Sequence, residues 1–471
     1  MIKQYIILFI LFIFPSICFP ANLYVRDGAT GNCTVGWDVS DACDQISTAE
    51  TAASRGDTIY VADGSYTGFT LNTVASGSTV ITIKKATDDD YGSGTNWSSA
   101  YGDGVAAITS GVSISTSYWT IDGVVGGGPT SWASGHGISI YSTSNILITL
   151  SGTVSDINLS HIKMYSDRGS TFIAGIKGTT GAYDNIKVAY CELSNIFGAI
   201  FHIYNWTNST IEYSYLYANK STAEWHSEGI SSIGTNENIV IRYNLWDSIE
   251  GTAVFAGVNA GSSVNWQIYG NVFSRSETTI YYYWENPGTN QNSMSNSEFF
   301  NNTIIGINGI SQGGLIVQNG ENNIAYNNIW YDNDANAFGI SFTHDYSYAD
   351  LNVRTEGCTP ACDKDPDVIS GEANGWKDGG DPFESYGVDP LVADLTPSSG
   401  FFDSNPGFDT GGLVSGNDVD MNGVTRGSDG TWDMGAIEYG TAPENAIQGL
   451  TISNLQTIED LISWNRSDGL R

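Results

Sequence analysis

QIYGNVF from Gln267, EFFNNTI from Glu298 and IAYNNIW from Ile324 share one pattern, in which apolar residues alternate with others and a polar residue precedes the last apolar pair. The other copies of this pattern are INLSHIKM from Ile157, IKVAYCEL from Ile186, IEYSYLY from Ile211 and VIRYNLW from Val240. The shared polar position recurs every 23 to 31 residues, at His161, Cys191, Ser214, Asn244, Asn271, Asn302 and Asn328. A loose period of this length is typical of a solenoid.

The repeat unit is built from strands rather than helices. A Gly followed by an extended run precedes most copies, as in GAIFHIY from Gly198 and GISSIG from Gly229. The runs alternate with period two and carry β-branched and aromatic residues, which excludes helical repeats. Leucine-rich repeats are disfavoured because no L-x-x-L-x-L pattern recurs, and a propeller would need longer, four-stranded units. We expect the recurring Asn residues to stack from coil to coil, since an amide can bond both the backbone and the next Asn.

The composition excludes some classes of function. The 471 residues include 18 Lys and Arg against 51 Asp and Glu, which gives a net charge of −33. A protein that binds nucleic acid through phosphate contacts needs a basic face, so we predict no nucleic-acid partner. Docking on anionic lipid is disfavoured for the same reason. The hydrophobic fraction of 41% is enough for a sizeable core.

The N-terminus has the pattern of an export signal. Lys3 precedes ten apolar residues, YIILFILFIF from Tyr5 to Phe14, a run too short to span a bilayer. We predict a signal peptide over residues 1–21 and a secreted or periplasmic protein; the alternative is an N-terminal anchor that stays attached. No other run is apolar enough to cross a membrane, so we expect no membrane partner after cleavage.

The cysteines fit an oxidising compartment. Cys33 and Cys43 lie ten residues apart in a polar loop, and Cys358 and Cys362 lie four apart in CTPAC. We predict two local disulfides from these pairs. Cys191 lies in an apolar strand-like run, and we expect a buried free thiol with no nearby group that would activate it.

The two ends of the repeat region carry further motifs. YVRDG at Tyr24, the amphipathic stretch CDQISTAETAASRGD from Cys43, and TIYVADGSYTG from Thr58 stand before it, and VDPLVAD at Val388 and WDMGAIEYG at Trp432 stand after it. With these motifs the chain resembles the pectate-lyase-like superfamily from roughly Asn22 to Gly440. The resemblance implies an all-β, single-stranded right-handed parallel β-helix over residues 22–395, with an N-terminal cap helix and a C-terminal cap over 396–440. Residues 441–471 read as a linker or tail that resembles the start of a fibronectin-III-like module.

Two glutamates form the first candidate site. Glu228 and Glu250 each precede a Gly that starts an extended run, and they are 22 residues apart. If these glycines are equivalent, the carboxylates stack at the strand spacing of ~4.8 Å, close to the ~5–5.5 Å of retaining glycosidases. His226 lies two residues before Glu228, and His202 would lie one coil below. We predict a catalytic cluster here; the alternatives are ordinary residues at the rim of a groove or a calcium site.

A lyase would need other groups. It removes a proton next to a uronate carboxylate with a base and neutralises that carboxylate with a cation. The resemblance implies a Lys or Arg base, usually with Ca²⁺, and the candidate bases are Lys177 and Lys220. GHGISI at Gly135 is similar to the GHG motif of polygalacturonase-type hydrolases, but we expect His136 to be a loop residue before a strand.

Two further motifs point to ligands. Tyr282 and Trp284, next to Glu285, could stack on sugar faces and bind substrate. DVDMNG at Asp418 fits half of a calcium loop and would use Asp418, Asp420 and Asn422, so Ca²⁺ is the one cofactor predicted.

The function favoured by these patterns is a secreted carbohydrate-active protein that cleaves a polysaccharide as a hydrolase, with paired Glu residues. One alternative is a calcium-assisted polysaccharide lyase. The other is a non-catalytic adhesin or tailspike-like rod that only binds. The sequence does not indicate the substrate or the oligomeric state.

Overall fold

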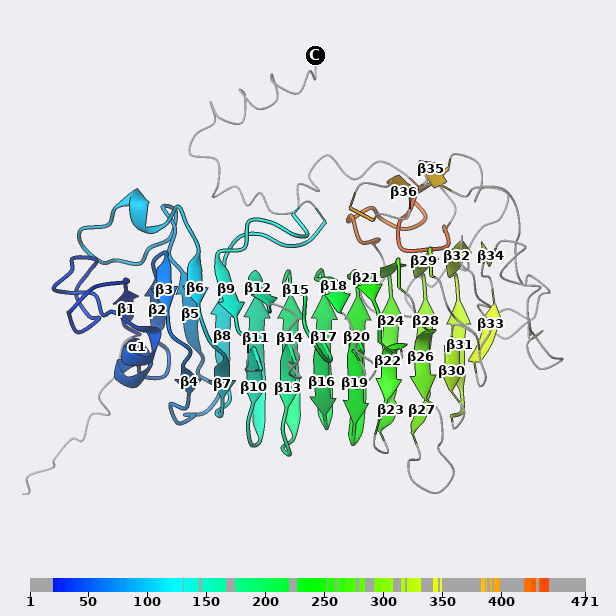
Figure 1. The fold of residues 1–471 in the computed structure, drawn as a ribbon, viewed down its shortest axis with the longest axis horizontal. Helices are drawn as coiled ribbons and strands as arrows, with labels where there is room; N and C mark the ends of the chain where they lie inside the picture. Colours follow the sequence, from blue (N-terminus) through cyan, green and yellow to red (C-terminus); the bar gives the residue numbers. More distant parts are fainter. Residues whose placement is uncertain are drawn as a thin grey trace, which may run out of the picture.

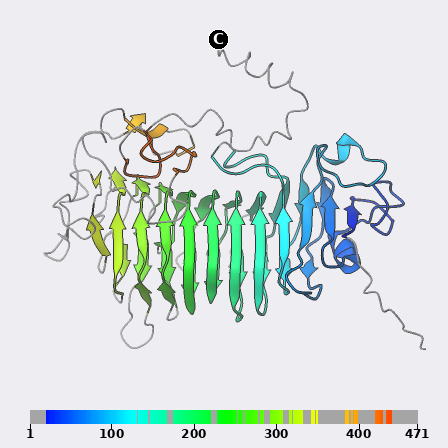
Figure 2. The ribbon, with the colours of Figure 1, turned by 180° about the vertical axis from the view of Figure 1, so that it is seen from behind.

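The structure is a computed structural model, and the parts of the chain it describes are residues 20–129, 131–143, 146–166, 174–219, 227–251, 253–258, 261–276, 279–283, 292–307, 315–317, 320–331, 342–345, 348–349, 383–385, 387, 390–391, 394–398, 419–428 and 432–439. Within them, the chain winds into coils that form three parallel sheets (Figures 1 and 2). The predicted signal peptide up to residue 19, Cys358, Cys362 and the tail from residue 441 lie outside the described residues.

Sheet A holds the longest strands. In spatial order it contains β1 (Asn22–Val25), β2 (Thr58–Val61), β5 (Ile81–Lys85), β8 (Trp119–Asp122), β11 (Val154–Ser160), β14 (Tyr183–Ala189), β17 (Trp206–Glu212), β20 (Thr235–Arg242), β24 (Gln267–Tyr269), β28 (Glu298–Phe300), β31 (Asn323–Tyr326) and β33 (Phe342–Asp345). Two short strands, β23 (Ser262–Val264) and β27 (Ser293–Ser295), extend it beside β20.

Sheets B and C complete each coil. Sheet B contains β4 (Thr70–Leu71), β7 (Val112–Ile114), β10 (Ile148–Leu150), β13 (Ile176–Gly178), β16 (Phe201–Tyr204), β19 (Ile230–Ile233), β22 (Ala253–Gly257), β26 (Thr279–Tyr283) and β30 (Leu315–Val317). Sheet C contains β3 (Gly64–Tyr66), β6 (Ala106–Ile108), β9 (Ile138–Tyr141), β12 (Ile162–Tyr165), β15 (Glu192–Ser194), β18 (Tyr215–Asn219), β21 (Leu245–Ile249), β25 (Val272–Ser274), β29 (Thr303–Ile305), β32 (Ile329–Tyr331) and β34 (Tyr348–Ala349).

Each coil passes through sheets B, A and C in that order, as β16, β17 and β18 do. The pairings within the three sheets are parallel, for example Ile211 with Ile241 and Leu216 with Trp246. Alternation within each strand sends one set of side chains into the coil, where they form one continuous apolar core. The predicted right-handed parallel β-helix is therefore confirmed.

A buried asparagine ladder runs along the corner between sheets A and C. The backbone N–H of Asn244, Asn271 and Asn302 each donates to the side-chain oxygen of the next Asn in the series, at 3.0 Å in every case. The amide nitrogens donate in turn to backbone carbonyls, as Asn271 does to Ile241 at 2.9 Å. The ladder ends at Asn328, and its Asn residues are fully buried. The stacking predicted from the repeat is confirmed.

The first member of the recurring polar position was predicted at His161, which is wrong by one residue. The register pairs Ser160 with Ala189, so Ile162 is level with Cys191 and His161 is level with Tyr190. His161 instead belongs to a column with a left-handed backbone, φ +56°, that continues through Tyr190, Tyr213 and Tyr243. Their rings stack on the outside of the corner with centroids 5.0 to 5.1 Å apart.

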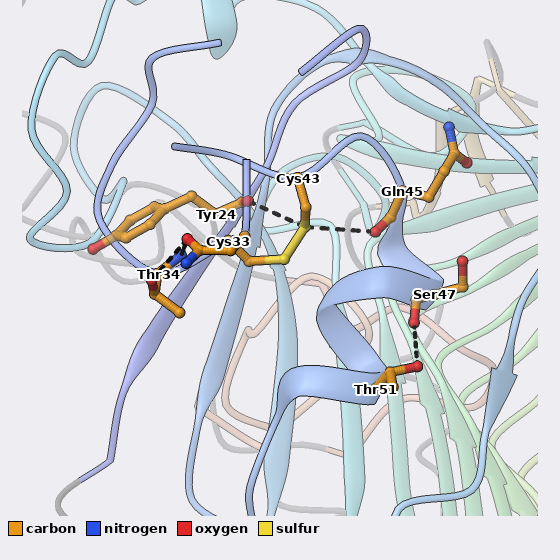
Figure 3. Close-up of a disulfide and its surroundings, with 8 residues drawn as sticks. Tyr24, Cys33, Thr34, Cys43, Gln45, Ser47 and Thr51 are labelled. Carbon is orange, nitrogen blue, oxygen red and sulfur yellow. Dashed lines mark hydrogen bonds between the residues drawn. A yellow bond between two sulfur atoms is a disulfide. The ribbon is translucent and has the colours of Figure 1, made fainter. Parts of the chain in front are cut away.

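The N-terminal end contains a short helix and a disulfide. Helix α1 (Ile46–Ala52) lies within the predicted amphipathic stretch, with Ile46 and Ala49 buried near β1 and β2. That it caps the coil stays a prediction. The Cys33–Cys43 disulfide is confirmed, and it joins the loop before α1 to the strand region around Tyr24 (Figure 3). A single 3₁₀ turn, η1 (Ser99–Tyr101), lies in a later loop.

The C-terminal segment lies along the side of the coils. Strands β35 (Phe383–Ser385) and β36 (Asp394–Pro397) pair antiparallel, and residues 419–428 and 432–439 follow above the later strands of sheet C (Figure 1). Met421 and Met434 pack with Leu245 and Ile329 of the sheet's outer face. The described part of the predicted C-terminal cap therefore covers an outer face; closure of the coil end stays a prediction.

Replacing Asn271 with Ala should destabilise the fold by about 2–4 kcal/mol, because the buried N–H of Asn244 and carbonyl of Ile241 both lose a partner. The measurement is the midpoint of urea unfolding. Asn265→Gly is the matched control: Asn265 donates to Asn238 in an exposed ladder, and Gly accepts its φ of +56°. Equal losses in the two variants would contradict a special role for the buried ladder.

Candidate functional site

One row of side chains on the outer face of sheet B brings several predicted residues together. Lys177 pairs in register with His202, and His202 pairs with Ser231 of the next strand. Neighbouring strands in a parallel sheet are separated by about 4.8 Å, so these side chains emerge side by side. Their flanking residues Phe201 and Ile230 point inward and are fully buried. Lys177 and His202, which were predicted for separate candidate sites, thus lie side by side.

His202 is held in its neutral form. Burial, and to a smaller extent the positive charge of Lys177, lower the pKa of His202 from its ordinary value of 6.5 to about 4. Desolvation disfavours a charged imidazole, and a nearby cation does so as well. At neutral pH the ring is therefore a proton acceptor that lies beside a cation. This pairing of a neutral base with a positive charge is the main chemical feature of the row.

Glu228 joins the row through Ser231. Its side chain is only 2% exposed, and its Oε2 accepts a hydrogen bond from the Ser231 hydroxyl at 2.9 Å. Ser231 was missed by sequence reasoning, which aligned coils on their glycines. In the structure the backbone of Phe201 bonds Gly229, so Gly198 and Gly229 are not equivalent. Aligning the inward apolar residues Phe201 and Ile230 would have found it.

The predicted stacking of Glu228 on Glu250 is wrong. Sheet B pairs Ile230 with Phe255, which places Glu228 level with Ala253. Glu250 comes three residues earlier in its coil, where the backbone of Gly251 lies against that of Ser227. The reason is that five residues separate Glu250 from Phe255 but only two separate Glu228 from its partner Ile230, so the Gly that follows each Glu does not mark the same point. Glu250 is half-buried.

Several predicted residues cannot be placed in this row. Lys220, His226, Trp284 and Glu285 lie outside the described residues. Tyr282 occupies the register position next to Ala256, two coils beyond Ser231, and its side chain is not described. Their catalytic and substrate-binding roles stay predictions.

The predicted calcium loop is a hydrogen-bonded turn in its described part. Asp420 is fully buried, and its two oxygens accept from the backbone N–H groups of Asn422, Val424 and Glu438 at 2.7 to 3.0 Å. Asp418 lies outside the described residues. Among the residues that are described, no group of three or more His, Cys, Asp and Glu could hold a metal ion. Calcium binding stays a prediction.

Two remaining predictions concern the free cysteine and membrane-spanning helices. Burial raises the pKa of the Cys191 thiol to about 12, so this fully buried cysteine is inert, as expected. No helix in the described ranges is both long and apolar enough to cross a bilayer.

Solved structures with similar folds are polysaccharide-degrading enzymes. A pectate lyase, Pel9A, superposes with a TM-score of 0.51 at 13% identity, covering 90% of this chain and 98% of its own. A mannuronic-acid-specific polysaccharide lyase from human gut microbiota reaches a TM-score of 0.41 at 10% identity, covering 63% of this chain and 76% of its own. An endo-xylogalacturonan hydrolase from Aspergillus tubingensis reaches 0.38 at 15% identity, covering 72% of this chain and 98% of its own.

Sequence comparisons add no family. No protein-family model matches the chain, and no curated protein matches it. At these identities the likeness to Pel9A shows the fold alone: the chain has the right-handed parallel β-helix of the pectate-lyase-like proteins.

The lowered pKa of His202 makes stability depend on pH. Between about 4 and 6.5 the unfolded chain binds a proton at this residue that the folded chain does not, so stability falls as the pH drops through this window. His202→Asn should flatten part of that fall, measured as the difference in urea midpoint between pH 7 and pH 4.5. Thr210→Ala, on the outer face of sheet A in the same coil, should leave the fall unchanged. Parallel curves for all three proteins would contradict a neutral His202.

Proposed function

We propose that this protein is a carbohydrate-active enzyme that cleaves a uronate-containing polysaccharide by β-elimination on the outer face of sheet B. The observation that carries the proposal is the neutral imidazole of His202 next to the cation of Lys177. Elimination from a uronate needs a base for the proton next to the carboxylate and a positive charge for the carboxylate itself. The row supplies both within one strand spacing.

The reaction follows from these roles. Lys177 holds the substrate carboxylate, and His202 takes the proton from the adjacent ring carbon. The released electron pair forms a carbon–carbon double bond while the glycosidic C–O bond on the next carbon breaks, and the leaving oxygen takes a proton from solvent. The Ser231–Glu228 pair lies on the other side of His202, where it can orient the imidazolium that forms. The step uses no oxidant, and none of it is routed through a metal.

The hydrolase with paired glutamates is the weaker candidate. It requires two carboxylates at a fixed separation, and the register of sheet B offsets Glu250 from Glu228. A net charge of −33 repels a polyuronate, so local cations such as Lys177, or bridging Ca²⁺, must offset it. Ca²⁺ therefore enters the proposal only as a counter-ion that helps the polyuronate approach, and the proton-transfer step does not require it.

The proposal also includes export of this protein to an oxidising compartment. The apolar N-terminal run after Lys3 supports it, as does the Cys33–Cys43 disulfide, because disulfides persist in oxidising compartments. Polysaccharide is the expected partner there.

The test is digestion of pectin, alginate, glycosaminoglycan and neutral glycans by the full chain, with and without Ca²⁺, followed by unsaturated-uronate absorbance and by new reducing ends. Unsaturated product is expected. His202→Asn should then lower kcat by roughly 10²–10⁴-fold, the usual worth of a positioned base. Lys177→Met should mainly raise KM for the uronate, and Thr210→Ala should leave both constants unchanged.

Three results would overturn the proposal. New reducing ends without unsaturated product would support the hydrolase instead of the lyase. No product on any glycan would favour the binding rod. A His202→Asn variant with full lyase activity would show that another residue is the base.

A further inference from the structure

A groove lies on the outer face of sheet C, away from the row on sheet B. One row of that face runs through Ser139, Lys163, Glu192 and Tyr215, and the adjacent row runs through Tyr141, Tyr165, Ser194 and Tyr217. Two hollows of about 480 Å³ and 650 Å³ lie over these rows, and both are lined by Ala133, Lys163 and Tyr165. Because they share this lining, they form one continuous groove.

The groove has a wall at each end. The connection between β8 and β9 reaches over the strands that follow it, and the C-terminal segment covers the later coils of sheet C (Figure 1). Ala133 and Trp132 belong to the first of these: Ala133 lines both hollows, and Trp132 packs against the apolar cluster that contains Tyr215. Leu391 of the C-terminal region lines the other end.

The groove contains a buried carboxylate oxygen without a partner. Glu192 is 4% exposed, and its Oε1 accepts from Lys163 Nζ at 2.9 Å and from the Ser194 hydroxyl at 2.7 Å. Its Oε2 is buried and has no hydrogen-bond partner among the described residues. Leaving a buried acceptor unpaired costs free energy, so a donor from outside the chain would be favoured at this point.

A second unpaired acceptor lies further along the same groove. His136, just before β9 as the sequence suggested, lines the smaller hollow, and its Nε2 is buried without a hydrogen-bond partner in the described chain. Burial lowers the pKa of His136 to about 4, so the ring is neutral. The ring also forms a hydrogen bond with the backbone of Tyr190. The Tyr190 N–H already donates to the carbonyl of Glu212, so the ring must donate from Nδ1 to the Tyr190 carbonyl. Nε2 is then an acceptor.

Aromatic rings and paired charges surround these acceptors. The rings of Tyr141 and Tyr165 lie 5.0 Å apart, and those of Tyr215 and Tyr217 lie 5.5 Å apart. The positive charge of Lys163 is matched by Glu192, and that of Arg275, at the far end of the groove, is matched by Asp247. The groove therefore offers flat apolar faces and unpaired acceptors. Both of these cations are already paired, and Asp103 adds a further carboxylate to the lining.

We propose that this groove binds a neutral oligosaccharide, with ligand hydroxyls donating to Glu192 Oε2 and His136 Nε2 and the Tyr rings contacting the sugar faces. Hydroxyl groups are the donors that two unpaired acceptors require, and sugars pair such donors with apolar ring faces. An anionic chain would instead bring further acceptors to a site that already has two. The site is separate from sheet B and does not depend on the reaction proposed there.

The test is calorimetric titration of the full chain with linear cello-, xylo-, manno- and galacto-oligosaccharides, with oligogalacturonate as the anionic comparison. At least one neutral series should bind. Glu192→Gln turns the acceptor into an amide and should weaken that binding about tenfold or more, as should Tyr217→Ala. His136→Asn is a further variant, should Glu192→Gln disturb the ion pair with Lys163 and the fold.

The controls separate this site from the one on sheet B. Tyr204→Ala removes a Tyr from the outer face of sheet B and should leave neutral binding unchanged, and His202→Asn should do the same while it abolishes cleavage. The proposal is overturned if no neutral series binds more tightly than about 1 mM. It is overturned equally if the groove variants bind as the parent does, or if they lose oligogalacturonate instead.

Discussion

Register between coils is the constraint on which everything else in this molecule depends, and the buried asparagine ladder enforces it. Each Asn satisfies a backbone N–H of the neighbouring coil and a carbonyl, in a corner that water does not reach. A slip of one residue would leave these groups unpaired and turn inward apolar side chains outward. The ladder therefore fixes which residues lie side by side in the coils from Asn244 onward. Ser214 continues it toward the coils of Lys177 and His202, because its N–H donates to Asn244 Oδ1 and its hydroxyl accepts from the N–H of Cys191.

The same register gives the two outer faces different chemistry. On sheet B, a cation and a neutral imidazole lie on adjacent strands. On sheet C, Lys163 and Arg275 are paired with carboxylates, and two acceptors are left over. One face suits a reaction on an acidic sugar, and the other suits recognition of hydroxyl groups. A polysaccharide carrying both kinds of unit could engage both faces of one molecule.

Prediction from sequence succeeded where local pattern and burial decide the outcome. Alternating apolar runs, the Asn column, the Cys33–Cys43 bond and the buried Cys191 all follow from such patterns. It failed where the length of a turn decides. Glu250 comes three residues before the position level with Glu228, because turns between strands vary in length without changing the strands. His161 was misplaced by one residue for a different reason: the register is continuous from Ile157 to Lys163, and the polar pattern was aligned on the residue before the true corner position, Ile162.

The sequence by itself determined the solenoid, its core and its ladder, because these depend on residues that repeat with the period of the coil. Only the tertiary structure decided which polar residues meet. Lys163 and Glu192 are 29 residues apart, and nothing in their spacing marks them as partners until the register of sheet C pairs them. The groove beside them also needs the β8–β9 connection and the C-terminal region, which come from opposite ends of the repeat. Contacts between segments so distant depend on how the whole chain packs, which local patterns do not encode.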